Sequence, residues 1–194
     1  MRLLLIRHGA TPWTVTGQHT GRSDVDLSEE GRAQVARLAP LIREHLDVPF
    51  DDVAVFSSPL RRAIESARIA MGGRDLLIDQ RLIEYDYGDC EGLTPPEVRE
   101  RMPGWDIWED GCPGGEQVDE VGERVGAFVA DVERVHRTAV VFAHSHVIRI
   151  MAAVATGLDA RDGRIFTLDT ASLSVIDDVR AKRVIQRWNV LPSR

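Results

Sequence analysis

Short apolar runs recur along the 194-residue chain, and polar or turn-forming residues bound each of them. Runs of four to eight residues with such boundaries are typical of buried strands. Strands are predicted at Leu3 to Arg7, Val53 to Ser57, Leu76 to Asp79, Ala139 to His144, Leu173 to Asp177 and Val184 to Trp188. The first run is too short for a signal-peptide core or a membrane span, so a buried parallel strand fits it better.

Helical spacing appears between the first two predicted strands. Ser28 can cap a helix whose first turn carries Glu29 and Glu30, where the helix dipole favours negative charge. Apolar residues then recur at intervals of three and four: Val35, Leu38, Ile42 and Leu46. Pro40 lies within this segment and predicts a kink or a split.

Three further helices are predicted. Ser58 as cap and Pro59 at the first helical position form a start signal, and the buried stripe of that helix is predicted to be Ile64, Ala67 and Met71. A long helix after Gly115 is predicted to turn inward Val121, Val125, Phe128, Val132 and Val135. The segment from Val147 to Ala155 is apolar almost all round, which predicts a buried helix.

The alternation of strands and helices predicts an α/β fold, with a mainly parallel sheet flanked by helices in three layers. Residues 1–194 are expected to form a single domain. The stretch 88–115 differs, because it is rich in Gly, Pro and Trp and its periodicity is weak. It predicts a lid-like insert, in which Trp105 and Trp108 fit a lid core and a substrate contact equally well.

Charge and cysteine content narrow the partners. A formal net charge of −7 disfavours nucleic acid, because binding to a phosphate backbone needs a clustered basic face. A small anionic metabolite stays compatible, since a local arginine cluster can make a positive cleft in an acidic protein. Cys90 and Cys112 are the only cysteines and imply no disulfide framework. A cytoplasmic protein without a membrane partner is therefore expected.

Chemically suggestive residues follow three of the predicted strands. His8 follows the first, Arg61 and Arg62 follow the second, and His144 ends the fourth. In open α/β sheets, ligands bind at the carboxyl ends of the strands. Arginine matches phosphate oxygens with two parallel hydrogen bonds, and a neutral imidazole can act as a nucleophile. Their convergence would suit phosphoryl transfer, which further needs an acid to protonate the departing oxygen.

Four motifs occur in order along the chain: Leu5 to Thr11, Ser57 to Ala63, Leu82 to Glu84 with Tyr87 to Gly92, and Val140 to His144. Together they resemble the histidine phosphatase superfamily, also called phosphoglycerate-mutase-like. The resemblance implies that fold. It also implies that the functional arginine of the second motif is Arg62 and not Arg61.

The resemblance further implies residue roles. His8 would accept the phosphoryl group, Glu84 would donate the proton, and the transferred group would be held by Arg7, Arg62 and His144. Substrate contacts are expected at Thr14, Gln18, Thr20, Gly21 and Ser145. Ser145 departs from the family pattern, which usually has glycine there, and its side chain narrows the space. No metal or organic cofactor is implied.

The expected activity is hydrolysis of a phosphomonoester on a small phosphorylated metabolite, either a sugar phosphate or a broad range of esters. A phosphoglycerate mutase is the alternative, although this chain is shorter than mutases of the family typically are. A catalytically silent phospho-ligand-binding protein is a third interpretation. The oligomeric state is not readable, although a homodimer is the commonest assembly.

Several of these residues also have purely structural interpretations. Arg61 and Arg62 could be surface residues of a helix, with Glu65 or Glu91 as partners of Arg62, and Glu84 could be a solvated loop carboxylate. His146 is expected to pack at a helix start.

A zinc site at His144 and His146 would need further ligands. His19, Asp24 or Asp26 could supply them, but no spacing pattern supports such a set, so no metal is expected.

Overall fold

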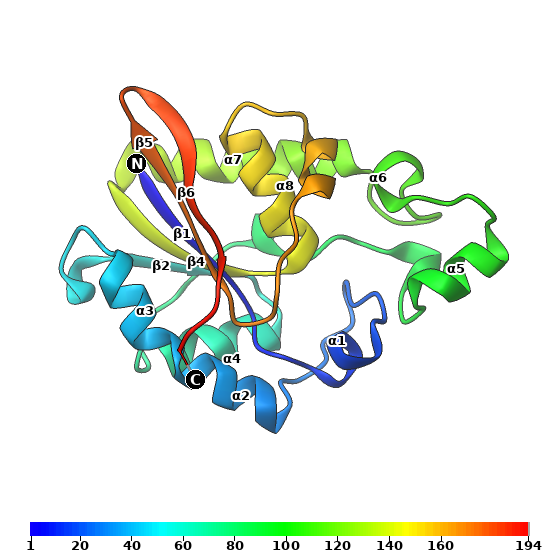
Figure 1. Ribbon diagram of the computed structural model, residues 1–194, viewed down its shortest axis with the longest axis horizontal. Coiled ribbons are helices and arrows are strands. Elements are labelled where there is room, and N and C mark those ends of the chain that lie inside the picture. The colour runs from blue at the N-terminus through cyan, green and yellow to red at the C-terminus, as the bar shows by residue number, and fades with distance from the viewer. Residues whose placement is uncertain (194) are drawn as a thin grey trace.

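The computed structural model describes residues 1–193 and contains one six-stranded sheet in the order β3-β2-β4-β1-β5-β6 (Figure 1). The strands are β1 (Arg2–Arg7), β2 (Ala54–Ser57), β3 (Leu77–Ile78), β4 (Thr138–Ala143), β5 (Leu173–Val179) and β6 (Lys182–Val190). The pairs β2–β3, β2–β4 and β1–β4 are parallel, whereas β1–β5 and β5–β6 are antiparallel. The predicted α/β fold with a mainly parallel sheet is confirmed.

All six predicted strands exist, and the central ones match most closely. The edge strand β3 is shorter than the predicted run, and its Leu77 and Ile78 are exposed because only β2 pairs with it. At the other edge, β6 is longer than predicted.

Helices cover both faces of the sheet (Figure 1). One face carries α2 (Glu29–Ala36), α3 (Leu38–His45) and α4 (Arg61–Ala70), and the other carries α7 (Val118–Val135) and α8 (Ser145–Ala155). Successive side chains of a strand point to opposite faces. Leu3 and Leu5 accordingly pack toward α7 and α8, while Leu4 and Ile6 pack toward α2, α3 and α4. These are the expected three layers.

The segment that contains Pro40 is split, as predicted, but three residues before the proline. Helix α2 ends at Ala36, and α3 begins at Leu38 with Pro40 as its third residue. The N–H groups of the first helical turn have no partner within the helix, so proline loses no hydrogen bond there.

Two details of the predicted helices are wrong. Helix α4 begins at Arg61 with Leu60 as its N-cap, so Ser58 and Pro59 do not start it; the Ser58 hydroxyl instead lies 2.7 Å from Nε2 of His144. Val135 is 76% exposed, because it is the last residue of α7.

The segment 88–115 lies at one end of the molecule, drawn in green in Figure 1, and contains α5 (Pro95–Arg101) and α6 (Ile107–Asp110). Its apolar side chains join the core beneath α7 and α8, including Val98, Trp105 and Trp108. The remaining helices are α1 (Pro12–Thr16) and short 3-10 turns at Phe50–Asp52, Gln80–Leu82, Gly88–Cys90 and Ala160–Ile165. Within residues 1–193, no helix combines the length and the apolar composition that a bilayer span requires.

Candidate active site

Two histidines meet at the carboxyl ends of β1 and β4. These strands pair in parallel with Arg7 opposite Ala143, so the residues that follow, His8 and His144, emerge side by side. The His8 backbone N–H donates to the Ala143 carbonyl at 3.1 Å, and the two imidazole centroids are 5.1 Å apart. The two histidines expected to converge at one edge of the sheet therefore do lie together.

The His8 imidazole is held in one tautomer. Its Nδ1 lies 2.7 Å from the carbonyl oxygen of Gly9 and donates a proton to it, which leaves the lone pair on Nε2. Burial lowers the pKa of His8 well below its usual value, and the positive charges of Arg62 and Arg7 lower it further. The ring is therefore neutral near pH 7, which is the form that can attack phosphorus.

Arg7 brings positive charge to the wall of the same cleft. One guanidinium nitrogen donates to the Leu168 carbonyl, and the buried Nε has no hydrogen-bond partner among residues 1–193. Guanidinium groups remain charged at any relevant pH.

Arg62 and His144 lie behind His8. Both are fully buried, and the Arg62 Nε–H donates to Nδ1 of His144 at 3.2 Å. His144 therefore carries its proton on Nε2, which lies 2.7 Å from the Ser58 hydroxyl. Burial, together with the charge of Arg62, lowers the pKa of His144 well below its usual value. Neither side chain is among the residues that line the cleft; the pair lies beneath it, with Arg62 as a buried positive charge and His144 neutral.

Glu84 faces the same cleft from the segment between β3 and α5. The residue is only 3% exposed, and its carboxylate accepts backbone N–H groups from Tyr85 at 2.9 Å, Val147 at 3.2 Å and His146 at 3.3 Å. Burial raises the pKa of Glu84 above its usual value, although these N–H groups and Arg62 oppose the rise. A carboxyl group in this environment retains its proton to a higher pH than a solvated one. Because Glu84 is buried, it is not the solvated loop carboxylate of the alternative, purely structural interpretation.

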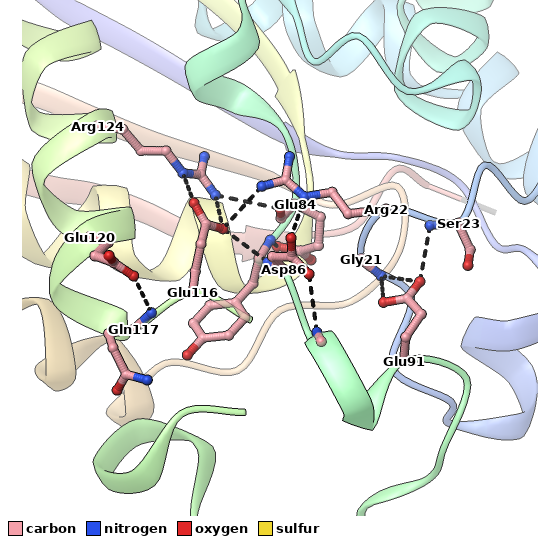
Figure 2. A network of polar contacts seen from close by, with 12 residues as sticks. Gly21, Arg22, Ser23, Glu84, Asp86, Glu91, Glu116, Gln117, Glu120 and Arg124 are labelled. Atoms are coloured by element: carbon pink, nitrogen blue, oxygen red, sulfur yellow. Dashed lines mark hydrogen bonds and ion pairs between the residues drawn. The ribbon is translucent and has the colours of Figure 1, made fainter. Parts of the chain in front are cut away.

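A polar network fixes the backbone that carries Glu84 (Figure 2). Arg124 of α7 binds the Glu116 carboxylate with two N–H groups at 2.8 and 3.0 Å and approaches the Glu84 carbonyl at 3.4 Å. Glu116 also accepts the backbone N–H of Asp86 at 2.9 Å. Arg22 pairs with Asp86 and Glu116 at 3.3 and 3.5 Å. The network joins α7, the acid-bearing segment and the loop after α1.

Glu91 holds the loop 20–23 against the site. Its carboxylate accepts the backbone N–H groups of Gly21 and Ser23 at 3.0 Å (Figure 2). The carbonyls of this loop in turn accept from the guanidinium of Arg62, at 2.8 to 3.0 Å. Gly21 is packed so closely that a Cβ there would lie 2.4 Å from the Tyr85 carbonyl oxygen. The loop 20–23 and the buried Arg62 are thus held together by direct hydrogen bonds.

The cleft that these residues border measures about 210 Å³. Four of the five predicted substrate contacts line it, namely Thr14, Gln18, Thr20 and Ser145, whereas Gly21 does not. Other lining residues were not predicted as site residues: Gly17, His19, Tyr87, Pro95 and His146.

The unpredicted aromatic residues form a connected wall. The Tyr87 hydroxyl lies 2.7 Å from Nδ1 of His146, and the His19 ring centroid lies 4.7 Å from that of Tyr87. His146 also packs on Trp108, with the centroids 5.1 Å apart, as expected for a residue at the start of α8. Tyr87 lies three residues after Glu84, at the start of the stretch Tyr87 to Gly92 in the third motif. This position was the only feature of the sequence that pointed to Tyr87 as a site residue.

The residues of the alternative metal reading serve other contacts. Both ring nitrogens of His144 face protein groups, and Asp24 pairs with the exposed Arg61 at 3.0 Å. Arg61 is therefore a surface residue, unlike Arg62. In the described part of the chain, no group of three or more His, Cys, Asp or Glu side chains is arranged to hold a metal ion.

Known proteins share this architecture. The model of the histidine phosphatase superfamily (branch 1) matches residues 3–191. An acid phosphatase of Mycobacterium tuberculosis is 38% identical over 90% of this chain and 85% of its own length. Phosphoserine phosphatase 1 of Hydrogenobacter thermophilus is 34% identical over 98% of this chain and 92% of its own.

The fold of this chain also matches that of a solved structure. A solved structure of a Mycobacterium tuberculosis protein superposes with a TM-score of 0.91 at 34% identity, covering 99% of this chain and 98% of that one. The expected phosphoglycerate-mutase-like fold is confirmed. The chain belongs to the histidine phosphatase superfamily.

Proposed function

We propose that this histidine-phosphatase-type enzyme hydrolyses the phosphomonoester of a small metabolite through a phosphoryl group carried on His8. One observation carries the proposal: a neutral imidazole, with its lone pair on Nε2, lines the same cleft as a buried carboxyl group whose pKa is raised. Because burial favours the neutral form of each group, the site holds a nucleophile and a proton donor in the protonation states that an attack on a phosphomonoester needs.

In the first step, Nε2 of His8 attacks phosphorus, and the bond between phosphorus and the ester oxygen breaks. Glu84 gives its proton to the departing oxygen, so an alcohol leaves and the carboxylate remains. Arg7 and the buried Arg62 stabilise the negative charge of the phosphoryl oxygens, which is where the transition state needs it.

In the second step, water attacks the phosphoryl group from the side that the alcohol has left. The Glu84 carboxylate accepts a proton from this water, the bond between phosphorus and Nε2 breaks, and inorganic phosphate departs. His8 is again neutral and Glu84 again carries a proton. Apart from the attacking water, the side chains named here supply every group that takes part in the two steps.

The relatives support hydrolysis over mutase activity, because proteins named phosphatases align over 85% and 92% of their own length. The volume of the cleft suits a small metabolite. The cytoplasmic location and the homodimer remain predictions.

A panel of phosphorylated metabolites, assayed for released phosphate, tests this function. We expect at least one small monoester to be hydrolysed, and 3-phosphoglycerate to give phosphate rather than 2-phosphoglycerate. Stoichiometric isomerisation with little free phosphate would establish the mutase instead, and binding without any turnover would establish the silent binding protein.

A further inference from the structure

A second pocket adjoins the cleft and shares part of its wall. It measures about 360 Å³, and three residues line both cavities: His19, Pro95 and His146. The transferred phosphoryl group must lie at His8, so the leaving group of the ester extends away from it. The shared lining residues place the second pocket directly beside the cleft that holds the ester.

Arg149 contributes a positive charge to the second pocket. It lies one helical turn beyond His146 on α8, and its guanidinium carbon lies 4.5 Å from the centroid of the Trp108 ring. Its Nε and one terminal nitrogen donate to the carbonyls of Gly163 and Arg164, at 3.1 and 3.3 Å. No carboxylate in residues 1–193 pairs with it, and its other terminal nitrogen has no hydrogen-bond partner there.

A half-buried guanidinium without a carboxylate partner is costly unless an anion compensates it. Arg99 of α5 lines the same pocket, is exposed, and is likewise without an ion-pair partner in the described part of the chain. The one acidic residue in the lining is Asp106, whose carboxylate accepts the backbone N–H of Trp108. Burial lowers the pKa of His146 well below its usual value, so this residue adds no charge near pH 7. The lining therefore has an excess of positive charge.

His19 gives a second, independent sign of an incomplete site. It is 9% exposed, lies on the wall between the two cavities, and its Nε2 is buried with no hydrogen-bond partner among the described residues. Buried polar atoms without a partner are rare in native proteins and call for an explanation such as a ligand or ordered water.

We propose that the second pocket binds the leaving group of the substrate, and that Arg149, assisted by Arg99, selects a leaving group with a second anionic group, either a carboxylate or a phosphate. This inference rests on the proposed function of the cleft. His146 and Arg149 are three residues apart, a rise of about 4.5 Å along the helix, so Arg149 lies close to the lining that the two cavities share.

Matched substrate pairs test the subsite. In 3-phosphoglycerate a carboxylate replaces the neutral hydroxymethyl group of glycerol 3-phosphate, and fructose 1,6-bisphosphate adds a second phosphate to fructose 6-phosphate. We expect a higher kcat/KM for the anionic member of at least one pair, and the pair that shows it distinguishes carboxylate from phosphate. Equal values, or a preference for the neutral member in both pairs, would overturn the proposal.

Variants assign the preference to residues. Arg149→Met keeps a long side chain over Trp108 but removes the charge, and should lower the anionic-to-neutral ratio of kcat/KM by about 10-fold to 100-fold, as loss of charge-assisted hydrogen bonds does. Arg99→Gln, on the exposed face of α5, should lower the same ratio by a smaller factor. Because the ratio is measured within one variant, a general loss of activity cancels.

The control is Arg161→Gln, since Arg161 pairs with Asp119 away from both cavities and its loss should leave the ratio unchanged. An undiminished ratio in both Arg149→Met and Arg99→Gln would reject the subsite while leaving the phosphatase intact. Failure of the unmodified enzyme to hydrolyse any monoester would instead reject the proposed function itself.

Discussion

At the scale of single residues, burial has opposite effects on the two groups proposed to do the chemistry. It lowers the pKa of His8 and raises the pKa of Glu84, because in each case burial disfavours the charged form. The nucleophile therefore stays neutral and the acid keeps its proton, which is the pair of states that the first step requires. The nearby guanidinium groups strengthen the first effect and weaken the second.

Glu84→Gln should slow turnover in a way that depends on the leaving group. Alkyl phosphates need a proton on the departing oxygen and should lose about 10²-fold to 10⁴-fold in kcat/KM, the usual contribution of general acid catalysis. An activated aryl phosphate, whose leaving group needs little protonation, should lose much less. Comparison of the two rates in one preparation measures this, and equal losses would remove Glu84 from the acid role.

The pH dependence of kcat/KM should have two limbs. Activity should fall at acid pH as His8 becomes protonated, which happens well below its usual pKa, and at higher pH as Glu84 loses its proton, which happens above its usual pKa. The optimum for an alkyl phosphate should thus lie on the acid side of neutrality. Glu84→Gln should abolish the high-pH limb, and a profile that keeps this limb would assign it to another group.

At the scale of elements, the pairing of β1 with β4 creates the site, because it sets His8 beside His144. Apolar runs predicted both strands correctly, since a parallel strand buried on both faces leaves a clear pattern in the sequence. The start of α4 could not be read in the same way. Ser58 and Pro59 form a genuine start signal, but the Ser58 hydroxyl is used by His144, a contact across 86 residues that local patterns do not encode.

Glu116 connects three parts of the chain (Figure 2). It accepts hydrogen bonds from Arg124 of α7 and from the backbone of Asp86, and it pairs with Arg22. Glu116→Gln keeps the shape but weakens these contacts. We expect kcat/KM on alkyl phosphates to fall by about 10-fold, the equivalent of roughly 1.4 kcal/mol, with a smaller loss on an aryl phosphate because Glu84 is displaced.

The matched control for this variant is Glu123→Gln, which changes an exposed glutamate of α7, the helix that follows Glu116. It should leave both substrates unaffected. A loss in Glu116→Gln that is equal on alkyl and aryl phosphates would show that the network supports the fold in general and not the position of the acid.

At the scale of the whole molecule, three histidines with strongly lowered pKa values link stability to pH. His8, His144 and His146 have pKa values well below that of an unfolded chain. As the pH falls below about 6.5, the unfolded state binds protons that the folded state does not, so the free energy of unfolding should fall by up to about 1.4 kcal/mol per pH unit for each histidine. The raised pKa of Glu84 acts with the opposite sign and offsets part of this loss.

Denaturant titrations from about pH 7 to about pH 5 would measure this slope. His146→Asn removes one of the three groups and should make the dependence shallower by about one proton. A free energy of unfolding that stays constant or rises as the pH falls through this range would mean that these imidazoles are not held neutral.

The layered fold could be predicted from the periodicity of apolar residues. The candidate site residues could be named because four motifs occur in order along the chain. The residues that shape the space around His8 were not. Tyr87, His19 and His146 come from three separate parts of the chain and meet only in the folded molecule, and each looks ordinary in its own stretch of sequence. The burial of Arg62 and His144 behind the cleft is likewise a property of the assembled molecule.

The most direct test is to trap the phosphorylated enzyme. The protein is mixed with a substrate labelled in its phosphate, quenched in alkaline detergent within one turnover, and digested for mass spectrometry. We predict an acid-labile phosphoryl group on the peptide that contains His8, and its loss together with turnover in His8→Ala. A label on any other residue, or substantial turnover by His8→Ala, would contradict the mechanism.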